Sequence, residues 1–298
     1  MTDFHISVLL KETIDGLRVE KNKKYIDATL GGGGHSFEIL RRGGIVLGID
    51  VDKEAVEYVE KLKTQNSKLK LENLTLVRGN FREIDRIAHL PRTKMVRGLN
   101  NFDKVAGVIF DLGVSSHQID SPTRGFSFQS QGPLDMRMDQ ELGVRALDLI
   151  KVLTKRELYE IFTKFGEESR AWAVSQAIVS ARSIKPIETT KDLAKIVFNI
   201  AGQSKRIFQA LRIIVNDELN SIMQALPIAL ELLEKNGRLC VISFHSLEDR
   251  IVKRKFIEFE EKDMGKIITE KPIVPSIEES KANKRAKSAR LRIFEKLI

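Results

Sequence analysis

Four consecutive glycines, Gly31 to Gly34, are the residues of this sequence best suited to hold a ligand. An apolar run at residues 25–26 leads into them, a helix-like segment follows at residues 37–42, and a second apolar run at residues 45–49 ends on Asp50. Because glycine has no Cβ, such a turn brings the backbone close to a ligand, and amides at the start of the next helix can face its polar groups. An acid about 20 residues after the glycines suits a ribose diol.

The glycine spacing does not by itself name the ligand. The series Gly31-x-Gly33-x-x-Ser36 lacks the third glycine of the dinucleotide-binding fingerprint, which is a weak signal even when complete. A dinucleotide-dependent dehydrogenase, a site for another nucleotide-like ligand and a glycine-rich turn without a ligand therefore all stay open at this point.

Four apolar runs in the first 111 residues end on polar or aromatic side chains: Asp27, Asp50, Asn80 with Phe81, and Asp111. In a parallel sheet the carboxyl ends of the strands meet at one edge, where ligands bind. There Asp50 would hold a ribose diol, Phe81 would pack on a purine face, and Asp111 would face the middle of the ligand. The alternative is that these residues only cap adjacent helices.

Two further segments place chemistry-bearing residues beside strand ends. Residues 111–120 follow the fourth apolar run with small and polar side chains, and Arg124, Phe126 and Phe128 add a guanidinium and two rings that can stack on bases. His245 stands where a fifth apolar run passes into a helix. For the two phenylalanines and the histidine, a purely structural role is the alternative.

Several other chemistries are disfavoured. The chain has neither the Gly-x-Ser-x-Gly turn of serine hydrolases nor the GxxxxGK[ST] phosphate loop. Cys240 is the only cysteine, which excludes an intrachain disulfide and a cysteine-based metal cluster, and no metal is expected.

The order of the apolar runs predicts the fold. Runs at residues 25–26, 45–49, 74–77 and 104–110 alternate with helical segments, which indicates a parallel, doubly wound sheet. From 116 to 210 the pattern is helical, and strand character returns at 238–244, with late strands at 267–268 and 291–294. A helix is expected over 206–233 with a break or kink at Pro227, and Ser246 with Asp249 forms a loose capping box.

We therefore predict an α/β, Rossmann-like domain made of residues 1–115 and 211–298. A helical insertion at 116–210, a candidate substrate-recognition domain, interrupts it between the fourth and fifth strands.

The amino-acid composition indicates the location of the protein and the kind of partner it binds. The 298 residues are 42% hydrophobic and 31% charged, enough for a core and for solubility. No apolar run spans a membrane and no secretory signal is seen, so a cytoplasmic location and no membrane partner are expected. The net charge is +9, and residues 281–298 hold seven basic residues against one acid. This basic C-terminal segment could bind a polyanion, and a solvated charged tail is an equally good interpretation.

Long and uncommon blocks of the sequence resemble the bacterial 16S ribosomal RNA cytosine-N4 methyltransferases, the MraW/RsmH family, over nearly the whole chain. The blocks are Asp27-Ala-Thr-Leu-Gly-Gly-Gly-Gly-His-Ser36, Phe110-Asp-Leu-Gly-Val-Ser-Ser-His-Gln118, Gly132-Pro-Leu-Asp-Met-Arg-Met-Asp139, Phe208 to Glu218, Val241 to Lys253 and Asn283 to Arg292. Gly32 and His117 depart from the family pattern, and the second departure concerns the path of the loop beside Gln118.

The resemblance implies a class I methyltransferase fold, S-adenosyl-L-methionine as cofactor and one cytidine in the decoding region of 16S rRNA as target. Whether the substrate is naked RNA or the small ribosomal subunit stays open. Carried over motif by motif, it implies cofactor contacts at Gly33, Gly34, His35, Asp50, Phe81, Asp111 and Gln118. The oligomeric state stays open between monomer and homodimer.

The expected reaction is an in-line displacement in which cytosine N4 attacks the sulfonium methyl carbon and S-adenosylhomocysteine leaves. The N4 lone pair is delocalised into the ring, so hydrogen-bond acceptors and a well-oriented approach have to assist it. Asp111, Ser115 and Ser116 are the candidate acceptors, and Phe126, Phe128 or His245 the candidates to receive the splayed base. A DNA cytosine-N4 methyltransferase would carry a Pro-Pro-aromatic run where this chain has Leu112 to Ser116, and a non-catalytic RNA-binding module would not retain the cofactor.

Overall fold

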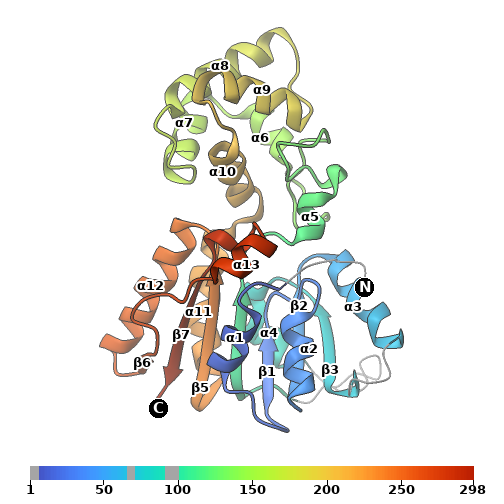
Figure 1. The fold of residues 1–298 in the computed structure, drawn as a ribbon. Helices are drawn as coiled ribbons and strands as arrows, with labels where there is room; N and C mark the ends of the chain where they lie inside the picture. Colours follow the sequence, from blue (N-terminus) through green and yellow to red (C-terminus); the bar gives the residue numbers. More distant parts are fainter. Residues whose placement is uncertain (1–6, 66–70, 91–100) are drawn as a thin grey trace. The chain divides into compact units, whose positions relative to one another are not determined.

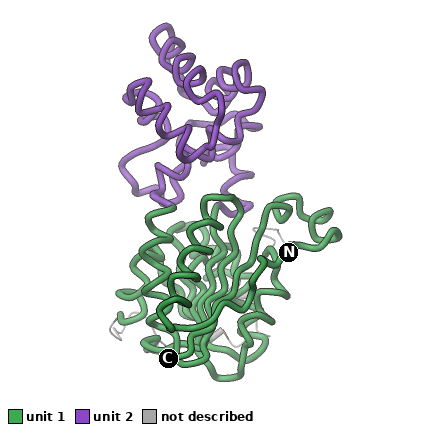
Figure 2. The backbone as a smooth tube through the Cα atoms, turned by 90° about the vertical axis from the view of Figure 1, so that its left-hand side faces the viewer, with its two compact units in different colours: residues 1–113, 219–298 green, residues 114–218 purple. Residues whose placement is uncertain are grey.

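A computed structural model describes residues 7–65, 71–90 and 101–298. The chain forms two compact units: a sheet unit of residues 1–113 and 219–298, and a helical unit of residues 114–218, coloured green and purple in Figure 2. The sequence analysis placed the insertion at 116–210. The helical unit extends to Glu218 because Ile207, Phe208 and Leu211 pack in its core.

The sheet unit is built on one seven-stranded sheet in the order β3-β2-β1-β4-β5-β7-β6 (Figure 1). Neighbouring strands from β3 to β5 are parallel, whereas β7 runs antiparallel to both β5 and β6. The predicted α/β fold is thus confirmed. The strands are β1 Lys24–Asp27, β2 Ile45–Asp50, β3 Leu74–Arg78, β4 Val105–Asp111, β5 Leu233–Ser243, β6 Gly265–Ile267 and β7 Arg290–Lys296.

Helices cover both faces of this sheet, because its inner strands are apolar on both sides. In β1, Tyr25 belongs to the core on one face and Ile26 to the core on the other. The first core includes buried residues of α1 and α2, and the second includes buried residues of α4, α11 and α12. The helices are α1 Leu10–Leu17, α2 Gly34–Arg41, α3 Lys53–Gln65, α4 Ile84–Ala88, α11 Glu218–Leu232, α12 Ser246–Glu261 and α13 Ile277–Ala282.

The helical unit has a core of its own, formed by apolar residues of α6 to α10 and the preceding loops. All of its residues, 114–218, are described, and none belongs to a strand of the sheet. Thr189 caps α9, with Asp192 completing a capping box. The helices are α5 Ser116–Asp120, α6 Ala146–Val152, α7 Lys155–Lys164, α8 Ala171–Ile184, α9 Thr190–Ala201 and α10 Lys205–Asn216.

Two local predictions differ from the structure. Of the break or kink expected at Pro227, the break does not occur, since Pro227 lies inside α11, and the chain breaks instead at Asp217, which adopts a left-handed conformation with φ of 49°. The cap of α12 is His245 with Glu248, one position earlier than the expected Ser246 with Asp249.

Other expectations concern chain segments outside the described ranges. The polar sequence of residues 91–103 predicts a loop, and this segment is described only from residue 101. The apolar spacing from Lys53 to Lys70 predicts a helix, and this helix is described to Gln65. Within the described ranges, no helix combines the length and apolar character needed to span a bilayer.

Candidate active site

The glycine turn and Asp50 form one hydrogen-bonded unit at the carboxyl edge of the sheet. The carboxylate of Asp50 accepts from the backbone N–H of Gly31 at 2.7 Å and from that of Asp52 at 2.8 Å. Gly31 and Gly33 have φ of 50° and 80°, a region that side chains with a Cβ rarely adopt. Burial raises the pKa of Asp50 to about 6.

Helix α2 begins at this turn with its backbone amides uncapped. Its N-cap is Gly33, which has no side chain to accept a hydrogen bond from them. The first N–H groups of a helix lack partners inside the helix, and the helix dipole makes that end favourable for electronegative groups. The turn therefore presents donors to a ligand while Asp50 presents an acceptor.

Asp27 and Asp111 are joined through the turn between them. Thr29 donates its backbone N–H to Asp27 at 3.3 Å, and its hydroxyl accepts the backbone N–H of Asp111 at 2.6 Å. The buried Asp27 also accepts the hydroxyl of Ser36 at 2.7 Å. Burial raises the pKa of Asp27, although His35 and these two donors oppose that effect.

His35 brings a second functional group to Asp111. Its Nδ1 lies 3.8 Å from a carboxylate oxygen of Asp111, and both side chains are buried. Its Nε2 is also buried and finds no hydrogen-bond partner among the described residues. An unsatisfied buried nitrogen is costly, so this atom marks a place where a polar ligand group fits.

Phe81 follows β3 in a short 3₁₀ turn, Phe81–Glu83, at the same edge. Its ring packs edge-on against Phe110, with 5.5 Å between centroids, and it remains partly exposed. Asn80 caps this turn by accepting the N–H of Arg82, so it has the capping role that the sequence analysis kept as an alternative. Phe81 is thereby fixed beside the strand ends that carry Asp50 and Asp111.

His245 lies at the end of β5 and caps helix α12. Its Nδ1 accepts the backbone N–H of Glu248 at 3.3 Å, and Nε2 lies 3.1 Å from a carboxylate oxygen of Glu248. Glu248 also accepts the backbone N–H of Phe244 at 2.7 Å. The histidine that the sequence singled out for chemistry is thus occupied in shaping the turn after β5.

Ser115 and Gln118 form a reciprocal capping box at the start of α5 in the helical unit. The Ser115 hydroxyl accepts the N–H of Gln118 at 3.2 Å, and the Gln118 side-chain oxygen accepts the N–H of Ser115 at 2.9 Å. The neighbouring Ser116 is buried. The Ser-x-x-Gln spacing is a known helix-start signal that the sequence analysis did not use.

The two rings expected to receive a base contribute to the helical core. Phe126 is buried, and Phe128 packs against Phe208 with 5.7 Å between ring centroids. Arg124 is buried as well and donates to the carbonyls of Arg137 and Met138 at 3.2 and 2.8 Å. These three residues therefore support the unit from inside.

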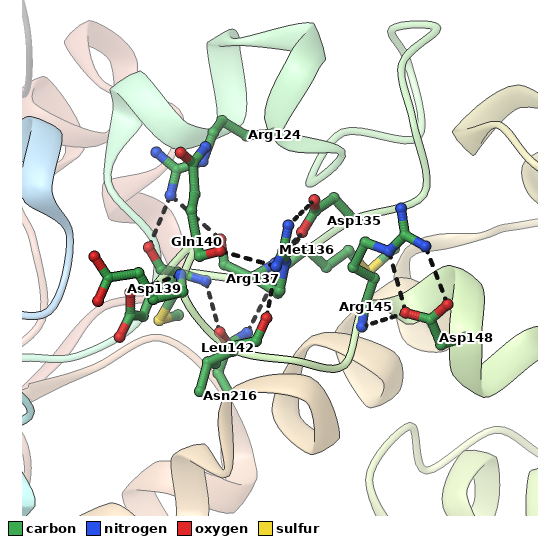
Figure 3. Close-up of polar contacts among 12 residues, drawn as sticks. Arg124, Asp135, Met136, Arg137, Asp139, Gln140, Leu142, Arg145, Asp148 and Asn216 are labelled. Atoms are coloured by element: carbon green, nitrogen blue, oxygen red, sulfur yellow. Dashed lines mark hydrogen bonds and ion pairs between the residues drawn. The ribbon is translucent and has the colours of Figure 1, made fainter.

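A hydrogen-bond network orders the segment after Gly132, as Figure 3 shows. Arg137 forms a two-pronged ion pair with Asp135 and also donates to the carbonyls of Gln140 and Leu142. Asn216 accepts the N–H of Met138 at 2.7 Å and donates to the carbonyl of Met136 at 2.8 Å. The motif quoted from the sequence is therefore held from α10, a contact that the sequence alone did not reveal.

The basic end of the chain is not a free tail. Arg292 is buried in β7 and donates to both carboxylate oxygens of Asp249 at 2.6 and 3.2 Å, while Arg290 donates to the same group at 3.0 Å. Lys296 donates to the carbonyls of Glu231 and Leu233. Lys281, Lys284 and Lys287 are exposed, as is Arg290 although it pairs with Asp249.

The family comparison covers both units. Residues 2–297 match the model of the MraW methylase family. The chain belongs to this family. The family resemblance drawn from the sequence motifs is thereby confirmed, and the α/β sheet unit is that of a class I methyltransferase.

Relatives of this MraW methylase match over almost their full length. The "Ribosomal RNA small subunit methyltransferase H" of Clostridium botulinum (strain Loch Maree / Type A3) is 42% identical over 320 aligned positions, covering 98% of this chain and 99% of that protein. The protein of the same name from Carboxydothermus hydrogenoformans is 42% identical, with 98% of each chain covered. An rRNA methylase structure from Streptococcus thermophilus aligns with a TM-score of 0.47 at 13% identity, covering 98% and 99% of the two chains.

Proposed function

We propose that this MraW-family methylase transfers a methyl group from S-adenosylmethionine to the exocyclic N4 amine of a specific cytidine in the decoding region of 16S rRNA. Relatives named as methyltransferases of small-subunit ribosomal RNA support rRNA as the substrate. The cytidine and its N4 atom rest on the resemblance of the motifs.

The observation that carries the proposal is the unit formed by the glycine turn and Asp50. A carboxylate has about four acceptor positions, and the two bonds from Gly31 and Asp52 leave room for the two hydroxyls of a ribose. Phe81 offers an apolar ring on the next strand end, and His35 Nε2 offers a buried polar contact. These residues fit the sugar, base and polar end of an adenosyl cofactor.

S-adenosylmethionine would supply an electrophilic methyl group at this edge of the sheet. Asp111 would act as the acceptor that orients the target amine, since Thr29 and His35 fix its position. We also propose Ser115 and Ser116 as hydrogen-bond acceptors for the target amine. For Ser115 that role is compatible with capping, because its hydroxyl oxygen uses one acceptor lone pair for the N–H of Gln118 and keeps the other. Gln118 is proposed as a cofactor contact. A catalytic role of His245 stays a prediction beside its capping of α12.

The test is methyl transfer from radiolabelled S-adenosylmethionine to isolated small ribosomal subunits and to naked 16S rRNA, followed by nucleoside analysis. We expect the label in N4-methylcytidine. Label in another nucleoside would contradict the cytosine-N4 assignment, and no incorporation by protein that binds the cofactor would contradict the RNA assignment. The Asp111→Ala variant should lose most transfer activity, and normal transfer with normal cofactor affinity would remove Asp111 from the mechanism.

A further inference from the structure

An exposed aromatic and cationic cluster lies on α7 and α8, which pack side by side in the helical unit (Figure 1). Trp172 on α8 is the only tryptophan of the chain, and 53% of its surface is exposed. The Nζ of Lys155 lies 3.7 Å from the centre of its ring. Tyr159 meets the same ring edge-on, with 5.4 Å between centroids and 84° between planes.

This cluster lies on the surface and is not part of the hydrophobic core of the helical unit. Lys155 and Tyr159 are four residues apart on α7, so they project from one face of the helix. The Lys155 ammonium lies over one face of the indole and Tyr159 meets it edge-on. Trp172 is nevertheless about half exposed, so it keeps accessible surface beside its contacts with Lys155 and Tyr159. A large flat ring with a cation beside it is a combination that binds nucleobases.

The surrounding charge favours a polyanion. Residues 151–206 contain eleven lysines and arginines but six acids. Three of these acids accept backbone N–H groups inside the unit: Glu157 and Asp192 complete capping boxes, and the buried Glu168 accepts the N–H of Arg170. On α7, Arg156 pairs with Glu160 at 3.1 Å, whereas Lys155 lies over the ring of Trp172.

We infer that Trp172, flanked by Lys155 and Tyr159, is a stacking platform for unpaired bases of the RNA substrate. The inference deepens the proposed function and rests on RNA being the substrate. A base would stack on the open face of the indole while Lys155 interacts with the adjoining phosphate. Stacking of this kind tolerates any base, so the platform adds affinity for single-stranded RNA without selecting a sequence.

Because Trp172 is the only tryptophan, the emission of the full-length protein reports on this position alone when it is excited at wavelengths that the three tyrosines do not absorb. The probe is a short oligoadenylate, compared with the same strand paired to oligouridylate. We expect the single strand to quench the emission and the duplex to leave it nearly unchanged. Absence of quenching at concentrations where labelled oligoadenylate is bound would overturn the inference.

Variants separate stacking from general binding. Trp172→Ala should weaken binding of labelled oligoadenylate roughly tenfold, whereas Trp172→Phe should retain most of the affinity. Phe198→Ala is the matched control, because Phe198 is 61% exposed on α9 of the same unit and should not contribute. Equal effects of Trp172→Ala and Phe198→Ala would overturn the inference, as would an effect of Trp172→Ala on subunit methylation without any change in RNA binding, which would indicate a protein partner.

Unfolding curves of the three variants verify that the fold is intact. The proposed function is judged separately by methyl transfer of the unaltered protein to small ribosomal subunits. Transfer without quenching overturns the platform alone, and quenching without transfer overturns the proposed enzymatic function alone.

Discussion

Asp50 links the chemistry of the site to pH. Burial raises the pKa of its carboxyl to about 6, even though two backbone N–H groups donate to it. Only the ionised form accepts hydrogen bonds from both hydroxyls of a ribose. We therefore expect cofactor affinity to fall as pH decreases through 6, which calorimetric titration with S-adenosylmethionine between pH 5 and 8 measures.

Asp50→Asn supplies the control for that titration. An amide keeps one acceptor oxygen and has no charge, so affinity should drop about 10- to 100-fold, corresponding to the ~1.5–3 kcal/mol of a charged hydrogen bond. The remaining affinity should not change between pH 5 and 7. A wild-type protein whose affinity is flat across pH 6 would show that Asp50 does not hold the ligand.

The same carboxyl affects stability in the opposite direction. Its folded pKa, about 6, lies above the ordinary value of 3.8, so the folded state binds more protons than the unfolded chain between these values. Stability contributed by Asp50 is therefore present below pH 4 and lost as pH rises through 6. The group that we propose to hold the ligand at neutral pH thus costs fold stability there.

At the scale of elements, the ion pair between Asp249 and Arg292 fixes β7 to α12. Both side chains are buried. Burial alone would raise the pKa of Asp249, but the hydrogen bonds from Arg292 and Arg290 outweigh it and lower the pKa. Arg292→Met leaves a buried carboxylate without its main partner and should destabilise the protein by about 3–5 kcal/mol, measured by urea unfolding.

A double variant, Asp249→Leu with Arg292→Met, removes both charges and should recover much of that loss. In the wild type, the stability that comes from the lowered pKa of Asp249 is lost as pH falls through the folded pKa. The free energy of unfolding of Arg292→Met should therefore fall less in acid than that of the wild type. Equal destabilisation by the single and double variants would indicate that packing, and not the unpaired charge, dominates.

The 136–138 segment should depend on a single side chain from α10. Asn216→Ala removes the partners of the Met138 N–H and the Met136 carbonyl, each costing about 1–3 kcal/mol when left buried. We expect faster amide hydrogen exchange in residues 134–150. Gln140→Ala is the control, since the side chain is exposed and the contact to Arg137 uses the backbone carbonyl. Unchanged exchange in the Asn216 variant would contradict this anchoring role.

Local sequence patterns predicted the elements whose causes are local. The glycine turn and the strand ending on Asp50 were predictable because strand periodicity and the absence of a Cβ act over a few residues. The role of His245 was missed because histidine is an unusual N-cap, and Pro227 was misread because packing of α11 in the core of the sheet unit outweighs the lost hydrogen bond. The buried state of Arg292 was not predictable, since Asp249 lies 43 residues away in the chain.

At the scale of the whole molecule, exposed cations should govern the affinity for RNA. Arg290 and Arg292 have structural partners, so Lys281, Lys284 and Lys287 are the residues of the C-terminal region that remain for phosphate contacts. Replacing these three lysines by glutamine should reduce the salt dependence of RNA binding by about two units of the log–log slope.

Cofactor affinity should be almost independent of salt in both proteins, because the site residues contact a small ligand at the sheet edge. Binding of labelled 16S rRNA and of cofactor, each measured over a range of KCl concentrations, provides the comparison. An unchanged slope for RNA in the triple variant would place the phosphate contacts elsewhere. If the affinities for RNA and for cofactor depended equally on salt, the proposal that phosphate contacts dominate only RNA binding would be contradicted.

The position of β7 has a consequence for biosynthesis. The last strand of the chain lies between β5 and β6, and β6 pairs with it alone among the described strands. During translation, β5 can pair with β4 as soon as it emerges, but its other edge stays open until residues 290–296 leave the ribosome. The sheet of the nascent protein is consequently complete only after residues 290–296 have emerged, and a chain that lacks β7 would expose an unpaired, aggregation-prone edge of β5.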